Sequence, residues 1–394
     1  MSNARAEDLT KQAVTLLRKL VAFDSVSRNS NLPIINFIEK YLAEHKVVCT
    51  RVPSPDGKKS NLLARIGPEV VGGVVFSGHT DVVPIDGQDW HTDPFKVMER
   101  DGKLFGRGTS DMKSFIAICL AFVPQLMAMN LAKPIWFAFS YDEEVGCLGA
   151  PHLLEYVVKN IPLPAFAIIG EPTMMQVVTA HKGVVSFETT VEGLEWHSSQ
   201  PHLGVNAINV AVELIHQLNQ EAEKLVAGDM RDERFDPSHS TVHVGTIEGG
   251  TARNIIPKEC KFQWEIRPLP GEKYEPIVER FTKRCDELRT QMKKKSASAD
   301  IINRPMSHMS GVTLPASANK NCQTVMRCAL TNRELAVSFG TEAGVFNEHG
   351  VPAIICGPGN IEQAHKPNEF IELSQIHACV EFMLRLTSDA SLFK

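Results

Sequence analysis

The sequence lacks the features that mark a membrane protein or a disulfide scaffold. No uninterrupted apolar run approaches the roughly 18 residues that a membrane-spanning helix requires. No Cys-x-x-Cys pair occurs, and the nine cysteines are an odd number scattered through apolar segments such as 118–120 and 355–357. We therefore expect reduced thiols in the core of a soluble, cytoplasmic protein rather than a disulfide framework.

Clustered positive charge is also scarce. The formal net charge is -5, and the one dense basic run, Lys293-Lys294-Lys295, is typical of a solvated helix end. Nucleic acids and anionic membranes bind clustered lysine and arginine, so we expect neither as a partner. The N-terminal segment shows no basic stretch followed by an apolar one, so no secretory signal is expected.

The composition that remains is that of an ordinary globular protein. Hydrophobic residues make up 43% and charged residues 22% of the chain, which excludes a disordered or coiled-coil protein. A length of 394 residues exceeds that of one ordinary compact domain, so two domains are expected.

Helix and strand signals alternate through residues 1–182. Apolar residues at helical spacing predict helices over 7–20, 32–44 and 112–129. Short apolar runs predict strands over 61–66, 70–77, 135–140 and 165–169. Strands separated by helices indicate an α/β domain with a parallel or mixed sheet.

The pattern changes at residue 183. Residues 183–303 predict the order strand, helix, strand, strand, helix, strand, which is the order of a ferredoxin-like α+β domain. The predicted strands are 184–191, 241–247, 260–266 and 297–302, and the predicted helices are 206–220 and 272–293. The α/β pattern resumes over 304–394, with a strand at 353–356 and a helix at 374–386. We therefore expect a small domain inserted into a larger one.

Residue types that bind metals follow three of the predicted buried strands. His79 and Asp81 follow the first, Glu143 and Glu144 the second, and Glu171 the third. Open α/β sheets place their sites at the carboxyl ends of the strands, so these side chains should meet in one cleft.

With Asp111, this set brings about five carboxylates together, which is unfavourable without a neutralising charge. A pair of divalent ions supplies that charge, and mixed carboxylate and imidazole ligands suit zinc, cobalt or manganese. Two such ions ~3.5–4 Å apart can generate a hydroxide and stabilise its attack on a carbonyl. Each residue alone is weak evidence, since a single histidine is more often structural and Glu143-Glu144 alone is more often solvated. The joint arrangement predicts the metal site.

Five segments in chain order resemble the motifs of the M20-type metallopeptidases and deacylases. They are Gly78-His79-Thr80-Asp81-Val82-Val83-Pro84, Gly106-Arg107-Gly108-Thr109-Ser110-Asp111-Met112-Lys113, Asp142-Glu143-Glu144, Gly170-Glu171-Pro172-Thr173 and Gln363-Ala364-His365-Lys366-Pro367. The resemblance implies a mixed-sheet di-metal catalytic domain of the phosphorylase/hydrolase-like type, over 1–182 and 304–394. It also implies that 183–303 is a ferredoxin-like lid and dimerisation domain.

The resemblance also implies the role of each metal ligand. Asp111 would bridge two divalent ions, with His79 and Glu171 completing one site and Glu144 and His365 the other. Zinc is the expected metal, with cobalt as the alternative.

Two further carboxylates receive roles from the same resemblance. Asp81 would fix the orientation of His79. Glu143 would be the general base that takes a proton from the attacking water and passes it to the leaving amine.

Residues of the inserted domain match the family as well. The segment Gly193–Ile208 resembles the lid motif, in which His197 would cross the interface of a homodimer to stabilise the oxyanion. Asn254 and Arg267 resemble the positions that hold the substrate carboxylate. The alternatives are a surface histidine at 197 and a structural ion pair at Arg267. Glu195-Trp196 departs from the small residues usual in relatives, which leaves the local lid packing open.

Within the family, segments 340–344 and 357–359 are most similar to the acetylornithine deacetylases. The implied substrate is an N-acyl amino acid, and the implied reaction is hydrolysis of N2-acetyl-L-ornithine to L-ornithine and acetate, a step of arginine biosynthesis. Glu342 would pair with the ornithine ammonium group, or it is a structural carboxylate. The alternatives are a broad N-acyl-amino-acid deacylase, a succinyl-diaminopimelate desuccinylase, a glutamate-type carboxypeptidase, or a non-catalytic binding relative. The last would have lost Glu143 or a ligand, and none is lost.

Overall fold

The computed structural model describes residues 3–389 and residue 392, and the chain forms two compact units. The first unit comprises the chain up to Ala180 with 313–335 and the segment from Thr341 onward, and the second comprises 181–312 and 336–340. These limits differ slightly from the expected 182/183 and 303/304 boundaries. Along the described part of the chain, no helix combines the length and apolarity needed to cross a membrane.

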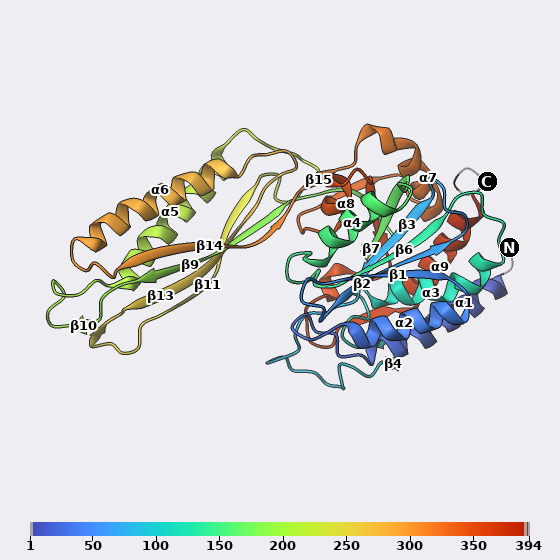
Figure 1. Ribbon diagram of the computed structural model, residues 1–394, viewed down its shortest axis with the longest axis horizontal. Coiled ribbons are helices and arrows are strands. Elements are labelled where there is room, and N and C mark those ends of the chain that lie inside the picture. The colour runs from blue at the N-terminus through green and yellow to red at the C-terminus, as the bar shows by residue number, and fades with distance from the viewer. Residues whose placement is uncertain (1–2, 390–391, 393–394) are drawn as a thin grey trace. The chain divides into compact units, whose positions relative to one another are not determined.

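The first unit contains a nine-stranded mixed sheet (Figure 1). Its strands lie in the order β1 (Val48–Pro53), β2 (Ser60–Ile66), β6 (Ile135–Ser140), β3 (Val74–His79), β7 (Phe166–Pro172), β17 (Ala353–Gly357), β8 (Val177–His181) and β15 (Val312–Thr313), with β16 (Glu334–Val337) pairing with β8. Strand β3 is parallel to β6 and β7, and β17 is parallel to β7, whereas β2 is antiparallel to both of its neighbours. The predicted α/β class with a mixed sheet is confirmed.

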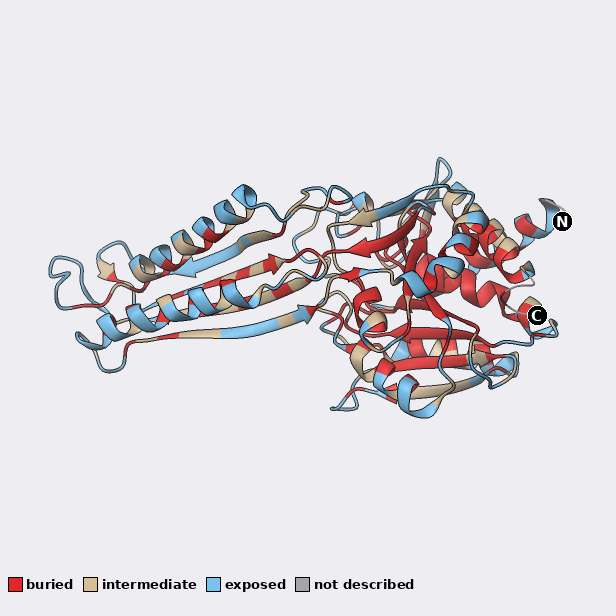
Figure 2. Cartoon of the chain, turned by 90° about the horizontal axis from the view of Figure 1, so that it is seen from above, coloured by how far each residue is buried: buried red, intermediate tan, exposed pale blue. Residues whose placement is uncertain are grey.

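Helices cover both faces of this sheet, so its central strands are buried throughout (Figures 1 and 2). The helices are α1 (Asn3–Val21), α2 (Leu32–Glu44), α3 (Lys113–Met127), α4 (Gly149–Asn160), α7 (Asn319–Ala329), α8 (Ala343–Glu348) and α9 (Leu373–Ser388). Helices α1, α3 and α9 pack on one another against one face, and α4 and α8 pack together against the other. All nine cysteines are free, and all but Cys49 are buried, as the sequence predicts.

Strand β3 is shorter than predicted at its start. The sequence predicts a strand from residue 70, whereas β3 begins at Val74. Gly73 has a φ of 77°, and a Cβ atom there would come 2.0 Å from the carbonyl oxygen of Pro134. The chain therefore turns at the glycines before it enters the sheet.

A small three-stranded sheet of the first unit is formed by segments that are close in sequence to Asp111 and His365. It has the order β18 (Phe370–Glu372), β5 (Lys103–Phe105) and β4 (Met98–Arg100). Phe370 pairs with Phe105, so the segment after His365 runs alongside the segment before Asp111.

The second unit has the predicted strand and helix order. Strands β9 (Val184–Glu192), β11 (Thr241–Gly249), β13 (Glu259–Arg267) and β14 (Asp300–Met309) form an antiparallel sheet of order β11-β13-β9-β14, with helices α5 (Ala207–Ala227) and α6 (Glu275–Lys293) between them in sequence. Alternate residues of β9 and β13 are buried, and both helices keep an exposed side (Figure 2). Trp264 lies between Phe187 and Phe281, with ring centroids 4.5 and 4.6 Å away.

Strand β14 corrects the predicted end of the inserted domain. The sequence predicts a short final strand over 297–302, ahead of Pro305, which cannot donate a backbone hydrogen bond. The strand runs from Asp300 to Met309, and its register shifts between Pro305 and Ser307. β14 is an edge strand, and a bulge in an edge strand accommodates proline. The predicted end of the strand at residue 302 was therefore too early.

Candidate metal centre

The predicted metal ligands all belong to the first unit, and several come from neighbouring strand ends. His79 ends β3, Glu171 lies near the end of β7, and the Glu143-Glu144 turn follows β6. Because β3, β6 and β7 are parallel, their carboxyl ends share one edge of the sheet. Asp111 precedes α3, and His365 lies between the 3₁₀ helix Ile361–Gln363 and β18.

The structure brings these side chains together. His79 Nε2 lies 3.0 Å from Asp111 Oδ1 and 3.9 Å from Glu171 Oε1. His365 Nε2 lies 2.9 Å from Glu144 Oε2 and 3.5 Å from Asp111 Oδ2. The two oxygens of Asp111 therefore face two different histidines, which is the arrangement of a carboxylate that bridges two ions.

The donor atoms fit a cation. Two groups place one ligand atom from each residue within 4.8 Å of the others: His79, Glu143 and Glu171, and His79, Asp111 and Glu144. Glu171 is 4% exposed, and its Oε1 has no hydrogen-bond partner. A buried carboxylate oxygen without a donor is costly, and a bound divalent ion removes that cost.

The electrostatics of the cluster also favour a bound cation. Burial lowers the pKa of His79, but Asp111, Glu143 and Glu171 outweigh this effect and hold that pKa well above its ordinary value. Burial, with the neighbouring carboxylates, raises the pKa of Glu143 and of Glu171 well above the usual range. The mutual repulsion of these acids is the force that a cation would relieve.

Gly170 explains how α3 approaches the strand that carries Glu171. A Cβ atom at Gly170 would lie 2.0 Å from the ring of Phe115 in α3. Glycine is therefore required before Glu171 for this helix to pack on β7.

Asp81 contacts both the histidine and the turn that carries the two glutamates. His79 Nδ1 lies 2.9 Å from the backbone oxygen of Asp81 and 3.7 Å from its Oδ1. The carboxylate accepts hydrogen bonds from Ser27 Oγ at 2.6 Å and from the backbone N–H groups of Glu143 and Glu144 at 3.1 and 3.3 Å. The backbone of Asp81 orients the histidine, while its side chain organises the 143–144 turn.

Cys147 contacts the predicted general base. Its thiol donates to Glu143 Oε1 at 3.5 Å. Glu143 thus lies on the His79 and Glu171 side of the cluster, whereas Glu144 turns toward His365.

Glu342 is buried beside the sheet. It is 1% exposed, and its Oε2 accepts a hydrogen bond from Ser77 at 3.3 Å. Ser77 lies on β3, two residues before His79, so Glu342 approaches the strand that carries this predicted ligand.

Glu369 is a residue that the sequence reasoning missed. It is 1% exposed and accepts four hydrogen bonds, from the Arg107 guanidinium and from the backbone N–H groups of Gly108, Ser110 and Asp111. Its position four residues after His365 is the only signal in the sequence.

Three predicted residues belong to the second unit. His197 and Asn254 are exposed; His197 in β10 (Trp196–His197) pairs with Ile255 in β12 (Ile255–Ile256), so Asn254 is close by. His197 Nδ1 accepts a hydrogen bond from the backbone N–H of Ser199 at 3.1 Å. Arg267 ends β13, and its Nε donates to Glu265 at 2.7 Å.

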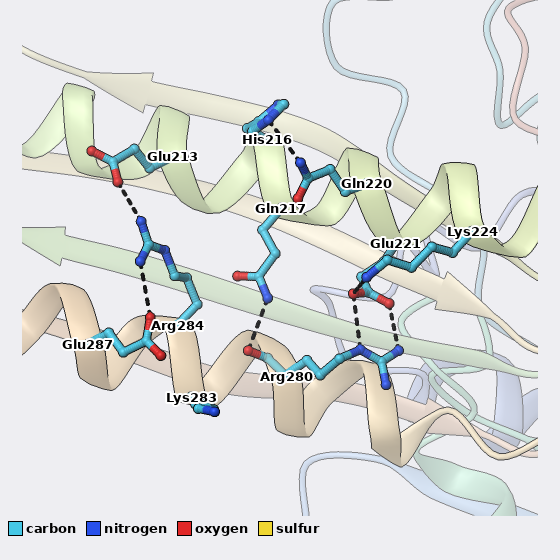
Figure 3. Close-up of a pocket in the computed structure, with 10 residues that line it drawn as sticks. All are labelled: Glu213, His216, Gln217, Gln220, Glu221, Lys224, Arg280, Lys283, Arg284 and Glu287. Carbon is cyan, nitrogen blue, oxygen red and sulfur yellow. Dashed lines mark hydrogen bonds and ion pairs between the residues drawn. The ribbon is translucent and has the colours of Figure 1, made fainter.

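The second unit also has a charged hollow of about 480 Å³ between α5 and α6 (Figure 3). Glu221 accepts two hydrogen bonds from Arg280 there, and Arg284 joins Glu213 to Glu287. Lys224, Arg280 and Arg284 bond to acids of the same two helices, and none of the cluster residues lines the hollow.

Comparison with protein families finds a match to the model of peptidase family M20/M25/M40 over residues 75–389. The acetylornithine deacetylase of Yersinia pestis is 36% identical over 385 residues, covering 95% of this chain and 96% of that protein. The acetylornithine deacetylase of Myxococcus xanthus is 34% identical over 374 residues, covering 94% and 95%.

Solved structures share the fold at lower identity. An M20 family metallo-carboxypeptidase from Sulfolobus solfataricus superposes with a TM-score of 0.76 at 16% identity, covering 95% of this chain and 98% of that one. A dinuclear metal binding peptidase of the M20 family from Bacillus subtilis gives a TM-score of 0.64 at 16% identity, covering 96% and 98%.

Proposed function

The chain belongs to peptidase family M20/M25/M40, and from this premise we propose that it is a di-metal amidohydrolase that removes the acetyl group from N2-acetyl-L-ornithine. The observation that carries the proposal is the arrangement of Asp111, whose Oδ1 lies 3.0 Å from His79 and whose Oδ2 lies 3.5 Å from His365. Relatives named acetylornithine deacetylase, at 33–36% identity over nearly the whole chain, support the substrate.

The ligands divide into two sets around Asp111. His79 and Glu171 would hold one ion, and Glu144 and His365 the other, with zinc as the expected metal and cobalt as the alternative. When bound, such a pair of ions lowers the pKa of water and polarises the amide carbonyl.

Glu143 is the proposed general base. It would accept a proton from the attacking water as the new carbon–oxygen bond forms. It would then donate that proton to the ornithine nitrogen as the carbon–nitrogen bond breaks, which releases acetate. The thiol of Cys147 contacts Glu143 Oε1, so a residue outside the proposed ligand set orients this carboxylate.

The second unit would supply the rest of the site. We propose that it acts as a lid and as the interface of a homodimer, with His197 stabilising the oxyanion and with Asn254 and Arg267 holding the substrate carboxylate. His197 is exposed on β10 and Asn254 is exposed just before the neighbouring β12, which supports this role. The alternative for Arg267 is a structural role, because it donates a hydrogen bond to Glu265. The cytoplasm is the proposed compartment.

Glu342 is the proposed partner of the ornithine ammonium group. Its near-complete burial requires the substrate side chain to reach well below the protein surface. Glu342→Gln removes the charge at constant size, so it should lower kcat/KM for N-acetylornithine more than for a neutral N-acetyl amino acid. An unchanged ratio of the two would assign Glu342 a structural role.

A substrate panel tests the function. Metal-free protein is reconstituted with zinc or with cobalt and offered N-acetylornithine, N-succinyl-diaminopimelate, neutral N-acetyl amino acids and a peptide ending in glutamate. We expect the highest kcat/KM for N-acetylornithine. Preference for another member would reassign the substrate within the family, and no hydrolysis of any member would identify a non-catalytic binding protein.

A further inference from the structure

A buried ion pair joins the two loops that carry Asp111 and His365. Arg107 and Glu369 are each 1% exposed, and Arg107 Nη1 lies 2.8 Å from Glu369 Oε2. Removing both charges from water is costly, so such a pair persists only where further hydrogen bonds satisfy it.

The carboxylate of Glu369 holds the backbone that ends at Asp111. Its Oε2 also accepts the N–H of Gly108 at 2.9 Å, and its Oε1 accepts the N–H groups of Ser110 at 2.8 Å and Asp111 at 3.1 Å. Three backbone donors on one carboxylate leave the turn little freedom, so the position of Asp111 is set by Glu369.

The guanidinium of Arg107 extends the network to the other loop. Its Nη2 donates to Gln88 Oε1 at 2.5 Å, and its Nη1 donates to the backbone oxygen of Lys366 at 3.3 Å. Gln88 Nε2 in turn donates to the backbone oxygen of His365 at 2.9 Å. The ring of Trp90, with its centroid 5.1 Å from Arg107 Cζ, covers the guanidinium.

The His365 loop needs such support because its backbone is strained. His365 has a φ of 62° and Asn368 a φ of 59°, and neither is glycine. A left-handed backbone is unfavourable for a residue such as histidine and persists where surrounding contacts impose it. The bonds from Gln88 and Arg107 to this loop are contacts of that kind.

We propose that Gln88, Arg107 and Glu369 form a positioning network that sets His365 opposite Asp111 and so determines the affinity of the ion shared by Asp111, Glu144 and His365. The inference rests on the proposed di-metal function. Residues that orient metal ligands typically contribute about 10–100-fold to metal affinity.

Zinc titration of metal-free protein tests the network, with a competing chelator to bring both affinities into range. Gln88 is only partly buried, so Gln88→Ala should fold. We expect this substitution to lower the affinity for one of the two zinc ions by about 10–100-fold and to lower the affinity for the other far less. Glu369→Gln keeps the size of the side chain and should lower the affinity for at least the same zinc ion.

A double-mutant cycle shows whether Gln88 acts through His365. In a His365→Ala background, Gln88→Ala should no longer weaken binding of the ion that Asp111 and Glu144 would hold, because the ligand that Gln88 positions is gone. An equal loss in both backgrounds would contradict the inference.

Glu221→Gln is the matched control. Glu221 is also a buried carboxylate, 3% exposed, and Arg280 donates to its two oxygens at 3.0 and 2.6 Å (Figure 3). It belongs to the second unit, so this variant should lower Tm and leave both zinc affinities unchanged.

Two outcomes separate this inference from the proposed function. If Glu369→Gln lowers Tm but binds both zinc ions like the wild type, the ion pair is only structural and the inference is wrong. If the wild-type protein fails to bind two divalent ions, the proposed function fails and the inference fails with it.

Discussion

Glu143 and Glu144 are adjacent in sequence but face different partners. Both group with His79, but Glu144 also groups with Asp111 and lies 2.9 Å from His365 Nε2, whereas Glu143 groups with Glu171. The preceding residue, Asp142, has a φ of 56°, so the chain turns sharply as it leaves β6. This difference is consistent with the roles proposed for them, Glu144 as a metal ligand and Glu143 as the general base.

Glu143→Gln should separate these two roles. The amide cannot accept the proton of the attacking water, so we expect kcat to fall by about 10²–10⁴-fold. Zinc content should remain that of the wild type, because the assigned ligands are unchanged. Steady-state kinetics and elemental analysis measure the two effects. A kcat close to that of the wild type would remove Glu143 from the role of general base.

His181 makes the stability of the protein depend on pH. Burial lowers its pKa from 6.5 to about 4, although the hydrogen bond between Nδ1 and the Lys182 carbonyl opposes this shift. The unfolded chain therefore takes up a proton between pH 6.5 and pH 4 that the folded chain does not. The folded state loses stability as the pH falls through this range, by up to about 3 kcal/mol from this group.

Urea denaturation of metal-free protein at pH 7 and pH 4.5 measures this contribution. We expect the free energy of unfolding of His181→Gln to change less between the two pH values than that of the wild type. Equal changes in the two proteins would show that His181 titrates alike in the folded and unfolded states.

At the scale of elements, parallel strands bring ligands together that the sequence separates. Strands β3, β6 and β7 deliver His79, the 143–144 turn and Glu171 to one edge because all three run in the same direction. This arrangement could be predicted, since each strand is a short buried run followed at once by a metal-binding residue type. Strands β1 and β8 were missed: most residues of β1 are exposed or only partly buried, and β8 is a five-residue segment interrupted by Thr179.

The aromatic stack of the second unit should control its stability and not the metal centre. Phe281 of α6 packs against Trp264 of β13 and is fully buried. Phe281→Ala removes this contact and leaves a cavity, so the free energy of unfolding should fall by about 3–5 kcal/mol. Zinc affinity should be unchanged, because the ligands belong to the first unit. Denaturation and zinc titration of the same variant measure both, and a loss of zinc affinity would contradict the separation.

At the scale of the whole molecule, metal binding and folding should be coupled. The clustered carboxylates repel one another without a cation, and any ligand that binds only the folded state stabilises it. Removing divalent ions should abolish activity and lower Tm, and zinc or cobalt should restore both. Thermal unfolding and activity are measured before chelation, after chelation and after reconstitution. Activity that persists in metal-free protein would require a different mechanism.

The fold class and the set of side chains that gather in the cluster could be predicted from the sequence alone. Hydrophobic period distinguishes strands from helices, and residue type limits which side chains bind a divalent ion. Only the tertiary structure decided how those side chains are held. Glu369 meets the backbone of Asp111 across 258 residues, and Gln88 meets that of His365 across 277. Such contacts depend on how distant loops pack against each other, and the local periodicity of the sequence does not predict that packing.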